Sequence, residues 1–420
     1  MESEREALLA GLERSLSPEA LRALRRAVAL AERVGLEPYL VGGGVRDLLL
    51  GAGHVDVDLV VEGDAIELAG AFAAEVRARV VRHLRFGTAT VTGDGFRLDF
   101  ARARTERYLR PGVLPSVRPA RIEDDLARRD FTINAMALSL ASRSAGRLVD
   151  PYGGQRDLDA KLIRVLHDGS FQDDATRILR AARYAGRLGF KLQRRTRNLI
   201  KRDVTYLRTI SGTRLRHEFE RIADEPGAAA ALRLAQQLGA LHATHEALCA
   251  GERALREARG LAGAPHRHEL VFCFLLANAP PRAATGAVQR LALTRKQAGA
   301  VRGLLALRNI ERRLASKTLL PSDAVRLLEP HPAVSVEAFA LLSAAALAAD
   351  RARRYLDEWH AVRPRLGGRD IEALGVPHGP KVGAALSMLR DAQLDGVTVT
   401  REDEVALVGK MAAERKTSRG

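Results

Sequence analysis

The stretch at residues 40–61 constrains the fold of this 420-residue chain more than any other. Asp56 and Asp58 lie two residues apart in a short apolar run, which predicts a buried strand with both carboxylates on the same face. Close like charges are unfavourable unless a cation neutralises them, and Mg²⁺ binds through carboxylate oxygens and substrate phosphates. The pattern therefore predicts a divalent-metal site, with a solvated strand end as the alternative.

A run of three glycines at residues 42–44 precedes this pair and begins a predicted helix that continues through Leu50. Glycine lets the backbone approach a ligand closely, and the N–H groups at a helix N-terminus attract phosphate. The alternative is a plain turn, with Arg46 paired to Asp47 or to a helix end. Together with the aspartates, the glycines predict a phosphate site next to a metal site.

Three motifs in the chain resemble those of one enzyme superfamily. The order Gly-Gly-x-Val-Arg-Asp-x-Leu-Leu-Gly and then Asp-x-Asp is similar to the first signature of the class II tRNA nucleotidyltransferases and bacterial poly(A) polymerases. Residues 128–137, Arg-Arg-Asp-Phe-Thr-Ile-Asn-Ala-Met-Ala, closely match the second motif. Residues 173–177, Asp-Asp-Ala-Thr-Arg, resemble the Glu-Asp-x-x-Arg motif, with Asp173 in place of the usual Glu. The resemblance is tight over residues 38–222 and looser over 365–400.

The resemblance implies template-independent nucleotidyl transfer from ATP and CTP to the 3′ hydroxyl of tRNA, assisted by two Mg²⁺ ions. Asp56 and Asp58 would hold the metals. Asp99, on a second predicted strand, would be a third catalytic carboxylate, or else an edge residue that faces water. The second motif would fix a turn into a following helix through Asp130 and Asn134. The residues expected to contact the nucleotide are Gly43, Arg46, Arg129, Asp174, Arg177, Arg180 and Arg183.

Asp174 and Arg177 are predicted to be neighbours on one helix face. Cytosine and adenine share an exocyclic amino donor beside a ring-nitrogen acceptor, whereas uracil and guanine present the reverse pattern. A carboxylate and a guanidinium in this arrangement would accept CTP and ATP and reject UTP and GTP. The alternative is a surface ion pair of little energetic consequence.

The positive charge of the chain is concentrated in one segment. The net charge is +16, and residues 177–221 contain 14 Lys or Arg against 3 Asp or Glu. Such a segment suits a polyanion, because each neutralised phosphate releases counterions, although a solubilising helix face is the alternative. Aromatic residues make up only 4% of the chain, which favours a folded RNA backbone, here the acceptor arm of tRNA, over base stacking. The predicted RNA contacts are Arg194, Arg195, Arg197 and Lys381.

The predicted fold class is α+β, a nucleotidyltransferase head with a small mixed β-sheet followed by an all-helical neck, body and tail. Strands are expected at 86–91 and 96–100, a helix at 64–79, and a long loop at 102–128, where Pro111, Pro115 and Pro119 exclude a helix interior. The expected division is 1–35 (N-terminal helices), 36–150 (catalytic head), 151–225 (neck, base recognition), 226–345 (body) and 346–420 (tail, tRNA binding).

No apolar run approaches the length of a membrane span, the N-terminus is charged, and only two cysteines are present. The expected location is therefore the cytoplasm. The expected reaction is addition of CCA to tRNA. Addition of only A or only CC, poly(A) synthesis, and a non-catalytic RNA-binding role remain as alternatives, and the full-length loop at 102–128 speaks against CC-only addition.

Overall fold

The structure, a computed structural model, describes residues 2–110, 112–113 and 115–417, with side-chain surroundings up to residue 411. The chain forms two compact units. The first comprises Met1–Glu218 and Ala230–Thr244, and the second comprises Phe219–Ala229 and His245–Gly420. The finer division into neck, body and tail stays a prediction.

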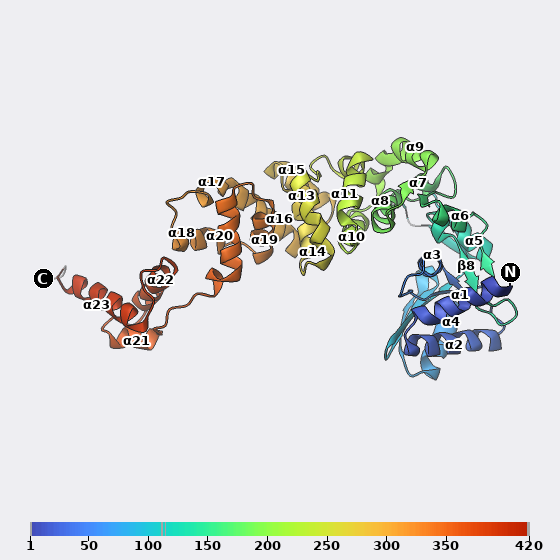
Figure 1. Ribbon diagram of the computed structural model, residues 1–420, viewed down its shortest axis with the longest axis horizontal. Helices are drawn as coiled ribbons and strands as arrows, with labels where there is room; N and C mark the ends of the chain where they lie inside the picture. Colours follow the sequence, from blue (N-terminus) through green and yellow to red (C-terminus); the bar gives the residue numbers. More distant parts are fainter. Residues whose placement is uncertain (1, 111, 114, 418–420) are drawn as a thin grey trace. The chain divides into compact units, whose positions relative to one another are not determined.

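A seven-stranded mixed sheet forms the centre of the first unit (Figure 1). All neighbouring strands are antiparallel except β2 and β5, which run parallel. In spatial order the strands are β3 (Arg79–His83), β4 (Thr88–Gly93), β5 (Phe96–Arg102), β2 (Asp58–Val61), β1 (Pro38–Val41), β8 (Ala137–Ser139) and β9 (Leu148–Val149). This arrangement confirms the predicted mixed sheet and the predicted hairpin of β4 and β5.

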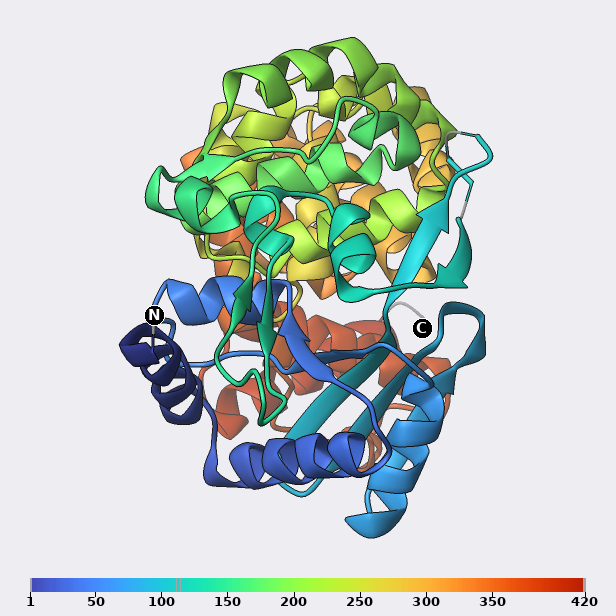
Figure 2. The same ribbon diagram turned by 90° about the vertical axis from the view of Figure 1, so that its right-hand side faces the viewer.

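Helices α2 (Pro18–Arg33) and α4 (Ala65–Glu75) pack on one face of the sheet, against β4 and β5 (Figure 2). The Phe72 ring of α4 lies 5.7 Å from the Phe100 ring of β5. Since neighbours along a strand point to opposite faces, Asp99 must point away from these helices. The N-terminal helices are confirmed, because α1 (Glu2–Ser15) precedes α2 and Ser17 caps α2. The helix predicted at 64–79 ends at Glu75, and β3 follows it.

The opposite face is partly covered by α5 (Ile122–Ala127), whose Leu126 joins a buried core with Tyr39 and Val60 of the sheet. The prediction of a long loop at 102–128 is wrong. Strands β6 (Arg104–Arg107) and β7 (Ser116–Pro119) form an antiparallel ribbon, and α5 follows. Proline at the end of an edge strand does not disturb the ladder, so the prolines did not exclude strands. Pro111 lies outside the described residues.

The remainder of the first unit is mostly helical. Helix α8 ends at Gly189, which has the left-handed conformation (φ 68°) that favours glycine at a helix C-terminus. The elements are η2 (Thr132–Asn134), α6 (Gly154–Asp159), β10 (Leu162–Ile163), α7 (Ser170–Asp173), α8 (Thr176–Leu188), β11 (Lys191–Leu192), α9 (Arg194–Asp203), η3 (Val204–Thr209), α10 (Gly212–Ala223), α11 (Ala228–Gln237) and α12 (Ala240–Thr244); α10 and α11 continue into the second unit.

In its described part the second unit is helical, with a core that contains Phe272, Phe274 and Phe339. A separate small core near its C-terminal end includes Leu366, Ile371 and Leu389. Nowhere in the described residues is there a helix that is both long and apolar enough to span a bilayer. The helices are α13 (Glu252–Glu257), α14 (Arg267–Leu276), α15 (Pro281–Arg290), α16 (Arg295–Asn309), α17 (Glu311–Leu314), α18 (Pro321–Leu328), α19 (Ala333–Leu342), α20 (Ala346–Asp357), α21 (Gly368–Ala373), α22 (Pro380–Leu394) and α23 (Arg401–Thr417).

Candidate active site

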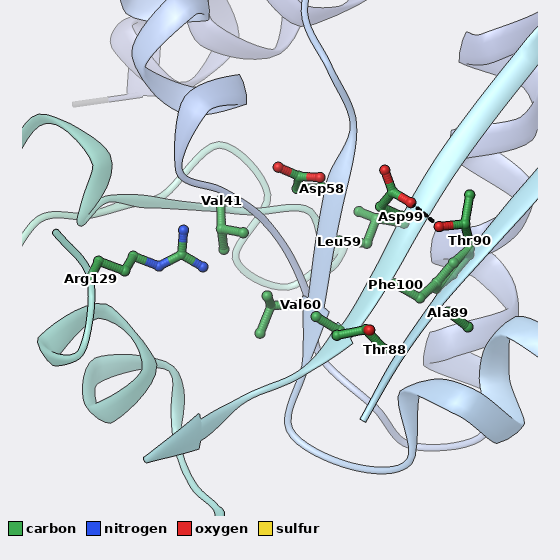
Figure 3. A pocket seen from close by; sticks show the side chains of 11 residues that line it. Val41, Asp58, Leu59, Val60, Thr88, Ala89, Thr90, Asp99, Phe100 and Arg129 are labelled. Atoms are coloured by element: carbon green, nitrogen blue, oxygen red, sulfur yellow. Dashed lines mark hydrogen bonds between the residues drawn. The ribbon is translucent and has the colours of Figure 1, made fainter. Parts of the chain in front are cut away.

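Two carboxylates lie side by side on the open face of the sheet. Asp58, the first residue of β2, is the direct register partner of Asp99 on the parallel strand β5. Thr90 on β4 is opposite Asp99, and its hydroxyl donates to the Asp99 carboxylate (Figure 3). Arg97 Nη2 also contacts Asp99, at 3.1 Å from Oδ2. Since register partners share a face, the two acids are presented together.

A pocket of about 300 Å³ covers this pair (Figure 3). Thr88 and Thr90 line one side of the pocket, and Val41 and Arg129 line the other side (Figure 3). Figure 3 shows the Arg129 guanidinium extended toward Val41. Two acids, one cation and small hydroxyls around one cavity suit a metal-bound anionic ligand.

The electrostatics of Asp58 indicate that a cation fits here. The surrounding protein removes water from its carboxyl group, although the side chain still faces the pocket, and the charges of Asp99 and Asp56 add repulsion. These effects raise the pKa of Asp58 to about 6, and the positive charge of Arg129 opposes them only in part. Within the described residues, no three His, Cys, Asp or Glu side chains gather closely enough to hold a metal. A bound Mg²⁺ would be held by carboxylates of this group and completed by water or substrate phosphates, and the assignment of Asp56 and Asp58 as its ligands stays a prediction.

Asp56 lies outside the strand. β2 begins at Asp58, so the prediction of a strand that includes Asp56 is wrong, yet Val55 and Val57 are buried while both aspartates are exposed. The expected alternation is thus present in extended backbone before the strand. Asp56 is near enough for its charge to act on Asp58, but it is absent from the pocket lining.

The glycine motif begins α3 (Gly43–Leu49), as predicted. Gly42 has φ 67°, a conformation that favours glycine, and a Cβ atom on Gly44 would lie 2.5 Å from the backbone oxygen of Asp56. These two glycines therefore position the helix start against the segment that carries the aspartates. A Cβ on Gly43 would make only an ordinary contact, 3.5 Å from Arg46, so this residue is not required by the packing of the protein itself.

Arg46 does not have the position expected for a phosphate ligand. Its side chain is only 2% exposed, its Nε and Nη2 each lie 2.8 Å from the Asp47 carboxylate, and its Nη1 donates to Asn134 Oδ1 at 2.6 Å. These bonds occupy all three nitrogens of the guanidinium. In this structure Arg46 connects α3 to the second motif, and its pairing with Asp47 is the alternative that the sequence allowed; its contact with the triphosphate stays a prediction.

The second motif forms a buried network rather than the start of a helix. Asp130 Oδ1 accepts from Phe131 N and Asn134 Nδ2, and its Oδ2 accepts from Arg180 Nε and Nη2 at 2.8 and 2.6 Å. Asp130 and Asn134 do fix a turn, but a single 3₁₀ turn and then β8 follow it. The prediction of a following helix is therefore wrong.

Asp174 and Arg177 are not paired with each other. Asp174 precedes α8 in extended conformation; its Oδ1 accepts from Thr176, and its Oδ2 accepts from Arg214 Nη2 at 2.7 Å. Arg177 is 5% exposed and donates to Ser170 Oγ and to a backbone carbonyl. The prediction that both lie on one helix face is wrong, because the helix begins at Thr176.

Arg180 and Arg183 also have acidic partners. Besides its bonds to Asp130, Arg180 Nη1 lies 3.9 Å from Glu218 Oε1, and Arg183 Nε lies 3.8 Å from Glu218 Oε2. Both guanidinium groups lie near the ring of Tyr184, at 5.6 and 4.6 Å from its centroid. These arginines thus belong to the same buried network, and their contact with a nucleotide stays a prediction.

The predicted RNA contacts differ in their surroundings. Arg194, Arg195 and Arg197 are all exposed on α9, but Arg195 forms an ion pair with Asp168. Across the described residues, no ion pair is found for Arg194 or Arg197. Lys381 is exposed in the first turn of α22, as predicted. Of the arginines, Arg194 and Arg197 are therefore the better placed to meet phosphate.

Sequence reasoning missed Asp125 and Glu106. Asp125 is 0% exposed and bonds two arginines, while the Glu106 carboxylate accepts from Arg104, Tyr108 and a further arginine. A signal for Asp125 was available, since Ile122, Asp125 and Leu126 have the i, i+3, i+4 spacing of a buried helix face. No such signal marks Glu106, because it lies on strand β6, in the segment where the sequence predicts a loop.

A mixed sheet with adjacent carboxylates beside a glycine-rich helix start defines a nucleotidyl-transferring head. Residues 38–164 match the family described as the Poly A polymerase head domain, and residues 189–250 match the one described as the probable RNA and SrmB-binding site of polymerase A.

Similar proteins identify the family more closely. The chain is 33% identical to the CC-adding tRNA nucleotidyltransferase of Deinococcus radiodurans, over 93% of this chain and 94% of that protein. It is also 33% identical to the A-adding tRNA nucleotidyltransferase of Geobacter sulfurreducens, over 96% of this chain and 48% of that protein. The chain belongs to the tRNA nucleotidyltransferase family. It spans about half or less of the length of the A-adding relatives that it matches.

Solved structures of the same kind are similar over nearly the whole chain. The Thermotoga maritima CCA-adding enzyme in complex with tRNA has a TM-score of 0.78 at 29% identity, covering 96% of this chain and 97% of that one. CCA-adding enzyme complexes with ATP and with CTP have TM-scores of 0.78 and 0.79 at 28% identity, and they cover 94% and 97% of this chain and 96% and 98% of those chains.

Proposed function

We propose that this chain adds nucleotides from CTP and ATP to the 3′ end of tRNA without a template, and that the product is the CCA end. The observation that carries the proposal is the pair Asp58 and Asp99, which face one pocket together with Arg129. Family membership supports the reaction class, and the tRNA, ATP and CTP complexes of similar enzymes support the substrates.

In this proposal Asp58 and Asp99 hold Mg²⁺, with Asp56 close by for a second ion. Bound Mg²⁺ would stabilise negative charge on the triphosphate and promote ionisation of the RNA 3′ hydroxyl. Thr90 and Arg97 fix the orientation of Asp99 through their bonds to its carboxylate. Arg129 presents positive charge to the phosphates from the opposite part of the pocket wall, and Gly43 leaves room for them at the start of α3.

Base choice is proposed for Asp174 and Arg177. Oδ1 of Asp174 accepts from both the backbone N and the hydroxyl of Thr176, whereas Oδ2 accepts only from Arg214 Nη2 and has a second lone pair, which can accept the amino group of cytosine or adenine. Arg177 is held by Ser170 and by the backbone oxygen of Arg128, which keep its guanidinium in one orientation. A fixed donor and acceptor would discriminate against uracil and guanine.

The test uses tRNA transcripts that end before CCA, after C and after CC, each with one labelled nucleotide at a time. The proposal predicts incorporation of C and A, no incorporation of G or U, and termination after the final A. A long adenosine tail on any RNA would identify a poly(A) polymerase instead. No incorporation with any transcript would refute the proposal.

Addition of only the terminal A is the second candidate, because the Geobacter A-adding enzyme matches 96% of this chain. It predicts incorporation of A alone, and only on the transcript that already ends in CC. The Asp58→Asn variant, which removes one carboxylate of the pair, is the inactive control for both candidates.

A further inference from the structure

Asp125 is a buried carboxylate that binds two consecutive arginines. It lies on α5 with 0% of its side chain exposed. Its Oδ1 accepts from Arg128 Nη2 at 2.7 Å and Nε at 2.9 Å, and its Oδ2 accepts from Arg129 Nη2 at 2.9 Å. Oδ1 also accepts from the backbone N of Arg104 at 3.2 Å, so each oxygen binds a guanidinium group and one of them binds strand β6 as well. Burying charge is costly, so the arrangement calls for a reason beyond stability.

Arg129 is the member of this group that reaches the pocket. Asp125 holds its Nη2, while its Nη1 lies only 2.5 Å from the place where a Cβ atom on Gly42 would be. The absent side chain at Gly42 thus makes room for Arg129 beside Asp58. Within the described residues, Arg129 Nε is buried and has no hydrogen-bond partner. The Arg129 side chain is 17% exposed and lines the pocket, so the outer part of its guanidinium, rather than the buried Nε, is the part that can meet an anionic ligand.

Arg128, held by the other oxygen of Asp125, extends the connection in two directions. Its Nη1 donates to Glu106 Oε1 on the β6–β7 ribbon at 2.9 Å, and its backbone oxygen accepts from Arg177 Nη2 at 2.6 Å. One carboxylate therefore fixes the backbone segment that carries the pocket arginine and supports the arginine proposed for base reading.

We propose that Asp125 is a positioning residue for nucleotide binding. It holds the Arg129 guanidinium so that the N–H groups that face the pocket meet the triphosphate. This inference rests on the proposed function, since it assumes a nucleoside triphosphate in the pocket. Asp125 does not itself line the pocket, so its effect on the triphosphate passes through Arg129.

The test is a double-mutant cycle on the dissociation constant of ATP with Mg²⁺ for the full chain, measured by calorimetry without tRNA. Asp125→Asn is expected to weaken ATP binding about tenfold or more, because Arg129 loses its orienting partner. In the Arg129→Gln background the same change should weaken binding by a clearly smaller factor, because only the connection through Arg128 to Arg177 remains. Asp124→Asn is the matched control, because Asp124 is exposed on the same helix, and it should bind ATP as the wild type does.

Two results would overturn the proposal: wild-type affinity in Asp125→Asn, or an equal loss with and without Arg129. If circular dichroism shows Asp125→Asn to be unfolded, Asp125→Glu replaces it. That variant keeps the charge but displaces the carboxylate by one methylene, so weaker binding supports positioning and wild-type binding refutes it. A wild type that binds ATP but extends no tRNA refutes the proposed function alone, whereas one that binds no ATP refutes both.

Discussion

Replacing Asp130 by Asn should selectively destabilise the first unit. Asp130 is 6% exposed, and one of its oxygens receives two bonds from the Arg180 guanidinium. Asparagine keeps the shape and the bond to Phe131 N but leaves Arg180 with only the more distant carboxylate of Glu218, at 3.9 Å. The cost of breaking a partly buried ion pair by removing one partner is several kcal/mol.

The pKa of Asp130 gives a second measure of this cost. Burial disfavours the charged carboxylate, but Arg180 and Asn134 outweigh it and lower the pKa from 3.8 to about 2. A pKa difference of this size corresponds to about 2 kcal/mol of stability at neutral pH. Because the folded pKa is the lower one, the contribution is complete above about pH 4 and is lost as the pH falls through about 2. The expected loss in Asp130→Asn is therefore about 2–4 kcal/mol at pH 7.

The aromatic residues allow the two units to be observed separately during urea unfolding. The only tryptophan, Trp359, lies in the second unit, whereas five of the six tyrosines lie in the first. Tyrosine absorbance should show a lower urea midpoint in Asp130→Asn, while the Trp359 fluorescence midpoint stays unchanged. The difference from wild type should shrink between pH 5 and pH 3. A loss below about 0.5 kcal/mol at pH 7, or one independent of pH, would contradict the assignment of Asp130 as a buried ion-pair partner.

Three further predictions concern chemistry and binding. Asp58→Asn should abolish transfer yet raise the melting temperature measured without Mg²⁺, because the raised pKa of about 6 means that the ionised Asp58 carboxylate disfavours the folded state. In the wild type, transfer should decline as the pH falls through about 6, because protons then compete with the metal for the Asp58 carboxylate. Replacing Arg194 and Arg197 together by Gln should weaken tRNA binding and reduce the slope of log affinity against log salt by about 1–2. Arg195→Gln should change the slope less, because Asp168 already neutralises Arg195. Filter binding at several salt concentrations measures the slope. Asp174→Asn should lower kcat/KM for CTP and ATP together and reduce discrimination against UTP about tenfold, and unchanged values for all four nucleotides would place base reading elsewhere.

The sequence predicted which aspartates lie on the open face of the sheet better than it predicted which of them are neighbours. Alternating apolar residues around Asp58 and Asp99 correctly predicted that both aspartates are presented outside a core. Their adjacency depends on the parallel register of β2 and β5, which are separated in the chain by α4, a 3₁₀ helix (Leu84–Phe86) and two strands. No local pattern encodes such a register, because it is set by how the whole sheet assembles.

The positions of two motif arginines were also difficult to predict from the sequence, because they depend on side-chain contacts between distant parts of the chain. Arg46 and Arg129 are both charged residues within matched motifs, and both were expected at the phosphates. The fold buries Arg46 between Asp47 and Asn134, and it directs Arg129 to the pocket, where Asp125 holds it. The sequence allowed the pair of Arg46 and Asp47 as an alternative, but the bonds of Arg46 to Asn134 and of Arg129 to Asp125 could be identified only in the folded chain.

The basic segment at residues 177–221 contains more cations than are available to bind RNA. The count of 14 cations over residues 177–221 suggests a large polyanion surface, but Arg177, Arg180, Arg195 and Arg214 donate to groups of the protein itself. A cation that already neutralises a carboxylate releases few counterions when RNA arrives, because binding must first break that pair. The salt dependence of tRNA binding should therefore be less steep than 14 phosphate contacts would require. A measured slope near that upper limit would mean that these internal pairs open when tRNA binds.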